Sequence, residues 1–224
     1  MDIINLSKQS DLDFHGVEAF KSLRSNIQFC GSDIKVIGIT SCTPSEGKSS
    51  VSMNLAEAFA DAGKKVVYID ADLRKSAILG RYHVNNKVNG LTLYLSGMNK
   101  RDSIVYKTNI QNLDMIFTGP VPPNPSELLG GEKFAQLISQ LKDSYDYVII
   151  DTPPLGSIID GAVVARVCDG MVMIIEAKTI SYKFAQKVLK QLERTGCRIL
   201  GTVLNKVDMG DKGYYSKYYG KYYG

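Results

Sequence analysis

Residues 41–50 read Ser-Cys-Thr-Pro-Ser-Glu-Gly-Lys-Ser-Ser and follow a short apolar run at Val36–Thr40. A glycine-lysine-serine sequence between a strand and a helix is typical of a P-loop, whose backbone amides and helix N-terminus bind phosphate. The lysine of such a loop reaches the β- and γ-phosphates, and the first serine ligates magnesium. Cys42 stands where the general motif has its first glycine, so the strict pattern is not met. We predict that ATP is bound here by the following residues: Thr43, Pro44, Ser45, Glu46, Gly47, Lys48, Ser49 and Ser50.

Two further apolar runs, Val66–Asp70 and Val148–Asp151, each end in a carboxylate. Ligands bind at the carboxyl ends of strands in open α/β sheets, where an aspartate beside a P-loop can hold magnesium or its waters. One aspartate at a strand end is more often a turn former, but two on a sheet with a P-loop favour a functional interpretation. The predicted magnesium ligands are Ser49, Asp70 and Asp151, and the predicted catalytic residues are Lys48, Asp70, Asp72 and Asp151.

Two features near these strand ends leave alternatives open. Asp72 and Arg74 extend the first run into DxDxR, and Arg74 either joins the site or pairs with Asp72 as a structural ion pair. Residues 205–208 read Asn-Lys-Val-Asp, which superficially matches the guanine signature of GTPases, but Asp151 is not followed by the DxxG pattern of those enzymes. We predict that Asn205 contacts adenine, and we assign no role to Asp208.

The chain ends in a tyrosine-rich segment that contains no aliphatic core residue, GDKGYYSKYYGKYYG from Gly210 onward. An adhesive tail or a nucleic-acid stacking strip could have this composition, but the interspersed glycine and lysine oppose a tight zipper and three lysines are few for nucleic acid. A repeated phosphate acceptor fits better. We predict a globular domain over residues 1–209 and a disordered tail over 210–224. The predicted phosphate acceptors are Tyr214, Tyr215, Tyr218, Tyr219, Tyr222 and Tyr223.

The rest of the chain alternates apolar runs with segments of helical periodicity, which predicts an α/β fold with a mostly parallel sheet and helices on both faces. The predicted strands are Lys35–Thr40, Lys65–Asp70, Leu113–Phe117, Tyr147–Asp151, Met171–Glu176 and Arg198–Leu204. The predicted helices lie near Gly16–Phe29, Gly47–Ala62, Lys133–Lys142, Asp160–Val167 and Ser181–Thr195. Gly63 and Gly196 are predicted helix C-caps. The proline-rich loop from Gly119 should start a helix with Asn124 as N-cap and Pro125 at its first position.

Bulk composition narrows the class of protein further. The 224 residues carry a net charge of only +4, from which we expect no nucleic-acid partner. The four cysteines include no CxxC pair and only two histidines accompany them, so neither a zinc site nor a disulfide framework is expected. The sequence shows no signal peptide and no apolar run of the roughly 18–20 residues that cross a bilayer, so we expect a cytoplasmic protein.

Together these motifs resemble the bacterial tyrosine kinases (BY-kinases) that accompany capsule and exopolysaccharide synthesis. The resemblance covers nearly the whole chain and includes VVYIDADLR, VIIDTPP, GPVPPNPSELL and the tyrosine cluster. It implies ATP-dependent autophosphorylation of the tail on tyrosine. The chain resembles the split form found in Firmicutes, in which a membrane protein supplies a cytoplasmic activating segment and recruits the kinase to the inner face of the membrane. A tyrosine phosphatase would be a further partner.

The same family carries an N-terminal ExxRxxR helix that mediates ring-shaped oligomers. The matching residues are Glu18, Lys21 and Arg24, and Lys21 departs from the pattern because a lysine cannot make the bidentate pairing of an arginine. We expect phosphorylation in trans within such an oligomer, on the resemblance alone. The competing hypotheses are a partitioning or division-site ATPase switch, whose second P-loop lysine is missing here, and a scaffold that binds nucleotide without turnover.

Overall fold

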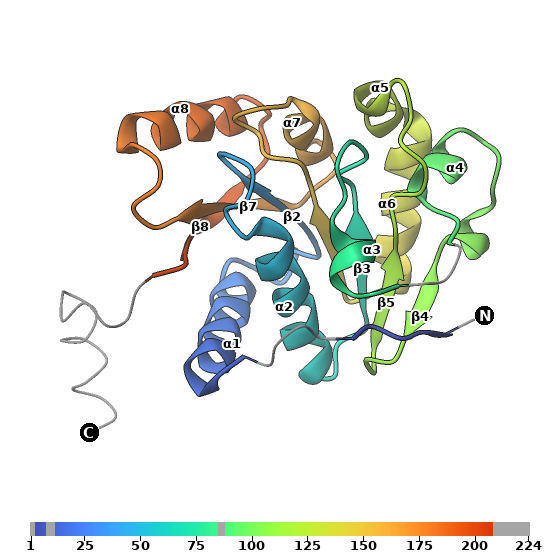
Figure 1. The fold of residues 1–224 in the computed structure, drawn as a ribbon, viewed down its shortest axis with the longest axis horizontal. Helices are drawn as coiled ribbons and strands as arrows, with labels where there is room; N and C mark the ends of the chain where they lie inside the picture. Colours follow the sequence, from blue (N-terminus) through green and yellow to red (C-terminus); the bar gives the residue numbers. More distant parts are fainter. Residues whose placement is uncertain (1–2, 8–11, 85–87, 208–224) are drawn as a thin grey trace.

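A computed structural model describes residues 3–7, 12–84 and 88–207 (Figure 1). Within these residues one eight-stranded sheet has the order β1-β4-β5-β3-β6-β2-β7-β8. Every neighbouring pair is parallel except β4 and β5, which are antiparallel. The strands are β1 (Ile3–Ile4), β2 (Val36–Ser41), β3 (Val66–Asp70), β4 (Tyr106–Thr108), β5 (Leu113–Ile116), β6 (Tyr147–Asp151), β7 (Gly170–Glu176) and β8 (Ile199–Asn205).

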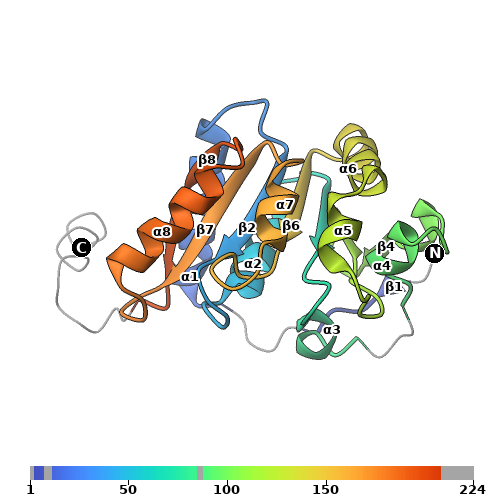
Figure 2. The same cartoon turned by 90° about the horizontal axis from the view of Figure 1, so that it is seen from above.

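Helices cover both faces of this sheet (Figures 1 and 2). α1 (Phe14–Phe29) and α2 (Lys48–Asp61) pack on one face. The helices on the other face are α4 (Leu91–Leu95), α5 (Pro125–Gly130), α6 (Glu132–Ser144), α7 (Asp160–Ala165) and α8 (Tyr182–Glu193). The short α3 (Ile78–Arg81) follows β3, and a 3-10 turn covers Arg101–Ser103.

The central strands consist of apolar residues because both of their faces are covered. All residues of β2 and β3 are buried. Their side chains alternate between the two faces: Ile37, Ile39 and Tyr68 pack under α2, whereas Val67 and Ile69 pack under α6. This alternation joins the two helical layers through one sheet and fixes the strand register, since a shift of one residue would exchange the faces.

The amphipathic helices bury one stripe each. In α6 the buried residues Phe134, Leu137, Ile138 and Leu141 recur at helical spacing, and α8 does the same with Ala185, Val188 and Leu192. α2 is buried over most of its length because it lies between the sheet and α1. Thus α2, which carries the P-loop lysine, is held more firmly than the outer helices.

The fold class predicted from the sequence is confirmed. All six predicted strands and all five predicted helices exist, with ends displaced by at most two residues. The prediction omitted β1, β4, α3, α4 and the 3-10 turn, which are two to five residues long. β4 is only half-buried and contains Lys107 and Thr108, so it lacks the apolar run that identifies a central strand.

The predicted helix ends agree with the backbone conformation. Gly63 and Gly196 have φ values of 76° and 78°, the left-handed conformation of a helix C-terminus. α5 begins at Pro125 after Asn124, as predicted, but the Asn124 side chain makes no capping hydrogen bond to the described residues. Among the described residues, no helix is both long and apolar enough to cross a membrane. The predicted tail, 210–224, and Asp208 lie outside the described residues.

Candidate active site

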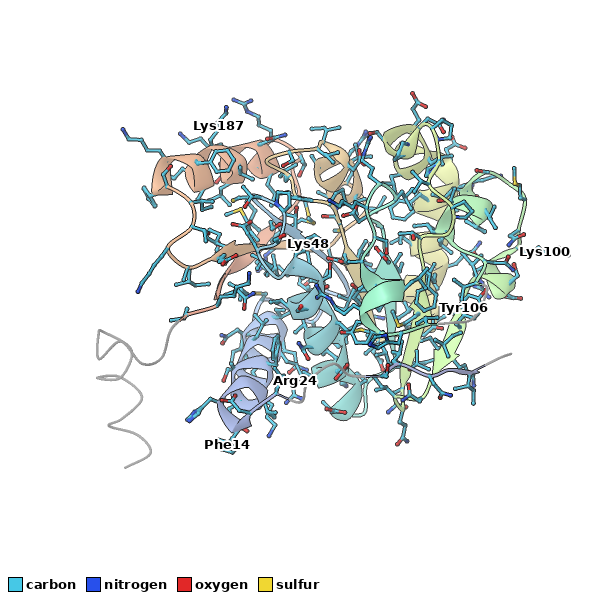
Figure 3. The ribbon with its side chains drawn as sticks, viewed as in Figure 1. Phe14, Arg24, Lys48, Lys100, Tyr106 and Lys187 are labelled. Carbon is cyan, nitrogen blue, oxygen red and sulfur yellow. The ribbon has the colours of Figure 1, made fainter. Side chains whose placement is uncertain are left out.

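Strand order brings the predicted site residues to one edge of the sheet. β6 lies between β2 and β3, and in its pairing with β3 Asp151 is directly opposite Asp70. The P-loop leaves the same edge of β2 and leads into α2, whose first residue is Lys48. Three segments that are separated in sequence therefore converge, as expected for carboxyl ends of parallel strands. Figure 3 shows Lys48 at this edge, near the centre of the molecule.

The P-loop is shaped by its own buried contacts. Ser45 and Gly47 have left-handed φ values of 68° and 86°. Glu46 is almost fully buried, and its Oε2 accepts a hydrogen bond from the Thr43 amide at 2.7 Å. Asn205, at the end of β8, donates from Nδ2 to the Glu46 carbonyl at 2.9 Å. The loop is thus braced from within and from β8, and its compact turn ends at the α2 N-terminus.

Lys48 and Asp151 form a buried ion pair. Lys48 Nζ lies 2.8 Å from Asp151 Oδ1 and 3.2 Å from Ser49 Oγ. The other carboxylate oxygen, Asp151 Oδ2, is buried and accepts no hydrogen bond from any described residue. A buried charged oxygen without a donor is costly, so this atom points to a missing partner.

Asp70 adds a second buried carboxylate beside the first. Its oxygens accept hydrogen bonds from the Ser76 hydroxyl and, at 3.3 Å, from the Asp72 amide. Burial, followed by the neighbouring Asp151, raises the pKa of Asp70 from 3.8 to about 7, although Ser76 and Lys48 oppose the shift. The two carboxylates, Asp70 and Asp151, have only the Lys48 ammonium group as a nearby positive charge. The site therefore keeps excess negative charge that a divalent cation can neutralise.

The side chains of Asp72 and Arg74 do not form an ion pair with each other. Asp72 is half-buried, and its Oδ1 accepts hydrogen bonds from the Arg74 and Lys75 amides at 3.4 and 3.0 Å. The Arg74 guanidinium instead makes two contacts with the fully buried Asp160, at 2.8 and 3.2 Å. Of the two alternatives left open for Arg74, the ion pair with Asp72 is therefore wrong, because the arginine side chain extends to Asp160 of α7.

The structure adds four residues that sequence reasoning missed. Ser126 of α5 donates to Asp160 and accepts from Arg74, which joins the proline-rich segment to the turn after β3. Ser76 holds Asp70, and Arg81 of α3 donates to Ser50 Oγ. The proline-rich segment was noted as a motif, but no local spacing links Ser126 to residues 34 and 52 positions away.

The predicted oligomer residues lie on α1, away from the active-site edge (Figure 3). Glu18 and Lys21 form an exposed ion pair at 2.7 Å within the helix. Arg24 donates to the Ala58 carbonyl at 2.7 Å and so fastens α1 to α2. Of the three residues, only Arg24 bonds to another helix; Glu18 and Lys21 pair with each other.

Comparison with known proteins identifies the class first. A family model described as an AAA domain matches residues 34–199, which agrees with the P-loop and the parallel sheet. The protein is thus a nucleotide-binding P-loop protein of the α/β class. Among relatives, a tyrosine-protein kinase CpsD of Streptococcus agalactiae is 42% identical over 205 residues, covering 89% of this chain and 90% of the relative.

Solved structures give the same result. The kinase domain of the Escherichia coli tyrosine kinase Etk has a TM-score of 0.84 at 30% identity, covering 96% of this chain and 94% of that chain. A chimerical protein, CapA2B2, has a TM-score of 0.83 at 34% identity, covering 92% and 95%. The chain belongs to the bacterial tyrosine-protein kinase family, and the family predicted from its motifs is confirmed.

The competing division-site class shares the fold but is less similar. A septum site-determining protein MinD from Pyrococcus horikoshii, solved with Mg-ADP, has a TM-score of 0.68 at 25% identity, covering 79% of this chain and 72% of that chain. The comparisons therefore support the ATPase-switch alternative less well than the kinase prediction.

Proposed function

We propose that this protein transfers the γ-phosphate of ATP to the tyrosines of its own C-terminal tail and thereby regulates capsular or exopolysaccharide synthesis. The observation that carries the proposal is the convergence of Lys48, Asp70 and Asp151 beside a P-loop. The tail supplies the acceptors: Tyr214, Tyr215, Tyr218, Tyr219, Tyr222 and Tyr223. β8 ends at Asn205, which touches the P-loop, so the chain enters the tail next to the proposed site.

The proposed roles follow from the contacts. Lys48 and the amides of residues 43–50 would bind the phosphates, and Asn205, which donates to the Glu46 carbonyl of the loop, would contact the adenine. Ser49, Asp70 and Asp151 would hold magnesium. These residues fit the ion, since Asp151 Oδ2 lacks a donor and the adjacent Asp70 has a raised pKa.

Two carboxylates are enough for magnesium, which commonly keeps several waters and takes further ligands from substrate phosphates. Within the described residues, no group of three or more His, Cys, Asp or Glu side chains could hold a metal unaided. When bound, magnesium would neutralise charge on the transferring phosphate. Lys48 would act in the same direction, and its present pairing with Asp151 keeps the side chain oriented into the site.

The transfer itself is a displacement at phosphorus. The phenolic oxygen of a tail tyrosine forms the new bond to the γ-phosphorus, the bond to the β–γ bridging oxygen breaks, and ADP leaves with the electron pair. The phenolic proton passes to a carboxylate, for which the sequence left Asp70 and Asp72 open. We assign the role of proton acceptor to Asp72. Asp70 is less suited to it, because both of its carboxylate oxygens already accept hydrogen bonds and the residue is only 1% exposed.

We further propose that transfer occurs in trans within a homo-oligomer built on α1. The helix exposes apolar side chains at its start, with Phe14 69% and Val17 39% exposed, next to the Glu18–Lys21 pair. A second copy of the chain could cover this strip, and Phe14 points away from the molecule in Figure 3. A membrane protein with a cytoplasmic activating segment would recruit and activate the kinase at the inner face of the membrane, and a tyrosine phosphatase would reverse the modification.

The test is incubation of the full chain with γ-labelled ATP and magnesium, with and without the cytoplasmic segment of a candidate activator, read by phosphotyrosine mass spectrometry. Label on the tail should disappear in Lys48→Met and persist in Lys107→Met, an exposed lysine on β4. Release of phosphate without any labelled tyrosine would instead support the ATPase switch.

Transfer in trans is tested by mixing two variants, neither of which can phosphorylate its own tail. One carries Lys48→Met with an intact tail, and the other has an intact P-loop with all six tail tyrosines changed to phenylalanine. Label on the Lys48→Met chain is expected only in the mixture. Its absence, with the unmodified protein active in parallel, would show that transfer is in cis.

A further inference from the structure

Helix α8 and its flanks carry the net positive charge of this protein. From Lys178 to Arg198 the sequence has six basic residues and one acidic residue, Glu193, a net of +5. The whole chain has a net charge of only +4, so the remaining residues together are slightly acidic. The excess is therefore confined to one segment of the fold.

Four of these cations form a stripe along one face of α8 and its C-terminal end. They lie at helical spacing and are all exposed: Lys183, Lys187, Lys190 and Arg194, here called the basic stripe. The opposite face, Ala185, Val188 and Leu192, is buried against the sheet. In Figure 3 Lys187 projects from α8 away from the sheet and into solvent.

The basic stripe has no acidic partner among residues 3–7, 12–84 and 88–207. None of its four side chains lies within ion-pair distance of a described carboxylate. Like charges at i, i+4 on a helix repel each other, so the arrangement is unfavourable by itself. A bound polyanion would remove this repulsion.

We propose that the basic stripe binds the C-terminal tail of this chain after the tail has been phosphorylated. The inference rests on the proposed tail phosphorylation. β7, which precedes α8, ends at Glu176, and Glu176 is the register partner of Asn205 at the end of β8. The described part of the chain therefore ends, at Val207, close to the edge of the sheet where α8 begins.

The tail is long enough to cover the stripe. Tyr214 follows Val207 by seven residues, which span about 23 Å when extended at ~3.3 Å per residue. α8 is 12 residues long, or about 18 Å. The reach of the chain from Val207 to the first tyrosine pair thus exceeds the length of α8.

Phosphorylation would reverse the sign of the interaction. Residues 208–224 contain three lysines and two aspartates, so the unmodified tail is weakly basic and is not attracted by the stripe. Each phosphate adds about −1.5 to −2 charges and strong acceptor oxygens for lysine. An anionic membrane would offer similar charge, but the apolar face of α8 is already buried, which removes the insertion that strengthens binding of surface helices to lipid.

The consequence is retention of the reaction product. A phosphorylated tail held on the exposed face of α8 is kept out of the P-loop site, so each modified tail stops competing for that site on its own or a neighbouring subunit. Release from the stripe would then be needed before a phosphatase gained access to the phosphotyrosines.

The experiment uses the full chain with all six tail tyrosines changed to phenylalanine, so that its own tail stays unmodified. A fluorescent synthetic peptide of residues 208–224, phosphorylated on Tyr214, Tyr218 and Tyr222, is titrated and followed by anisotropy. We expect saturable binding that weakens about tenfold in Lys183→Gln/Lys187→Gln/Lys190→Gln, from the loss of three exposed ion pairs. The matched control, Lys100→Gln/Lys107→Gln/Lys133→Gln, removes the same charge from exposed sites outside α8, on β4, on α6 and before the 3-10 turn, and should stay within about twofold.

Equal loss in both variants, equal binding of the unphosphorylated peptide, or no binding would overturn the proposal. So would capture of phosphatidylglycerol vesicles through the stripe by a protein that does not bind the phosphopeptide, an outcome that assigns α8 to the membrane. Circular dichroism checks folding, and the single Lys187→Glu variant repeats the measurement if the triple variant unfolds. The readout needs no catalysis, so a failure here is distinct from a failure of the kinase proposal.

Discussion

Replacing Asp70 with asparagine should stabilise the nucleotide-free protein while abolishing kinase activity. The pKa of Asp70 is raised from 3.8 to about 7, chiefly by burial and by Asp151. Between these two pKa values the folded state holds a proton that the unfolded state has released, so folding stability falls as the pH rises. A shift of about 3 units corresponds to about 4 kcal/mol of folding stability, which is fully present below pH ~4, falls as the pH rises, and is fully lost above pH ~7.

The assay is urea denaturation of the wild type and Asp70→Asn without nucleotide or magnesium at several pH values. The difference in free energy of unfolding should be small near pH 4 and should grow to several kcal/mol in favour of the variant by pH 8. Asp61→Asn, an exposed carboxylate on α2, is the matched control and should change stability by less than about 0.5 kcal/mol. If Asp70→Asn follows the wild-type pH profile or is less stable at pH 8, the reasoning about unneutralised negative charge is refuted.

Two other perturbations test the scaffold around the site. Gly90→Ala should destabilise the protein by roughly 2–4 kcal/mol in thermal or urea unfolding, because a Cβ there would lie 2.1–2.5 Å from the backbone of Thr118 and Gly119. The control is Gly80→Ala, since the space around Gly80 is open. If Gly90→Ala were as stable as the wild type, the two backbone segments would have to move apart. Arg74→Lys should lower the rate of tail phosphorylation roughly tenfold or more without abolishing folding, because lysine cannot make both contacts with the buried Asp160. An unchanged rate of phosphorylation would show that α5 and α7 need no fixed position for transfer.

Most of the fold could be predicted because its signals are local. Continuous apolar runs identify β2, β3, β6 and β7, and the glycines after α2 and α8 mark helix ends. β4 escaped prediction since two half-buried residues on either side of an exposed lysine resemble a loop. Its place in the sheet depends on antiparallel pairing with β5, which no local pattern announces.

The convergence of Lys48, Asp70 and Asp151 could also be predicted, for a topological reason. Carboxyl ends of parallel strands share one edge, so a P-loop and two strand-terminal aspartates are expected at the same edge of the sheet. The strand order adds that β6 is the middle strand of the three, which explains why Asp151 touches both Lys48 and the neighbourhood of Asp70.

Which side chains form ion pairs across the site could not be predicted from the sequence. Arg74 had a carboxylate two residues away, and proximity in sequence suggested that pair. The structure pairs it with Asp160, 86 positions away, because Asp160 is fully buried and requires a cation, whereas the half-buried Asp72 is satisfied by backbone amides. The partner of a charge in a folded protein is thus decided by which opposite charge is most desolvated. Two buried carboxylate oxygens have no hydrogen-bond partner among the described residues, Glu46 Oε1 and Asp151 Oδ2. Asp151 is the register partner of Asp70, so its Oδ2 is the atom beside a second buried carboxylate at which a bound cation would contribute most.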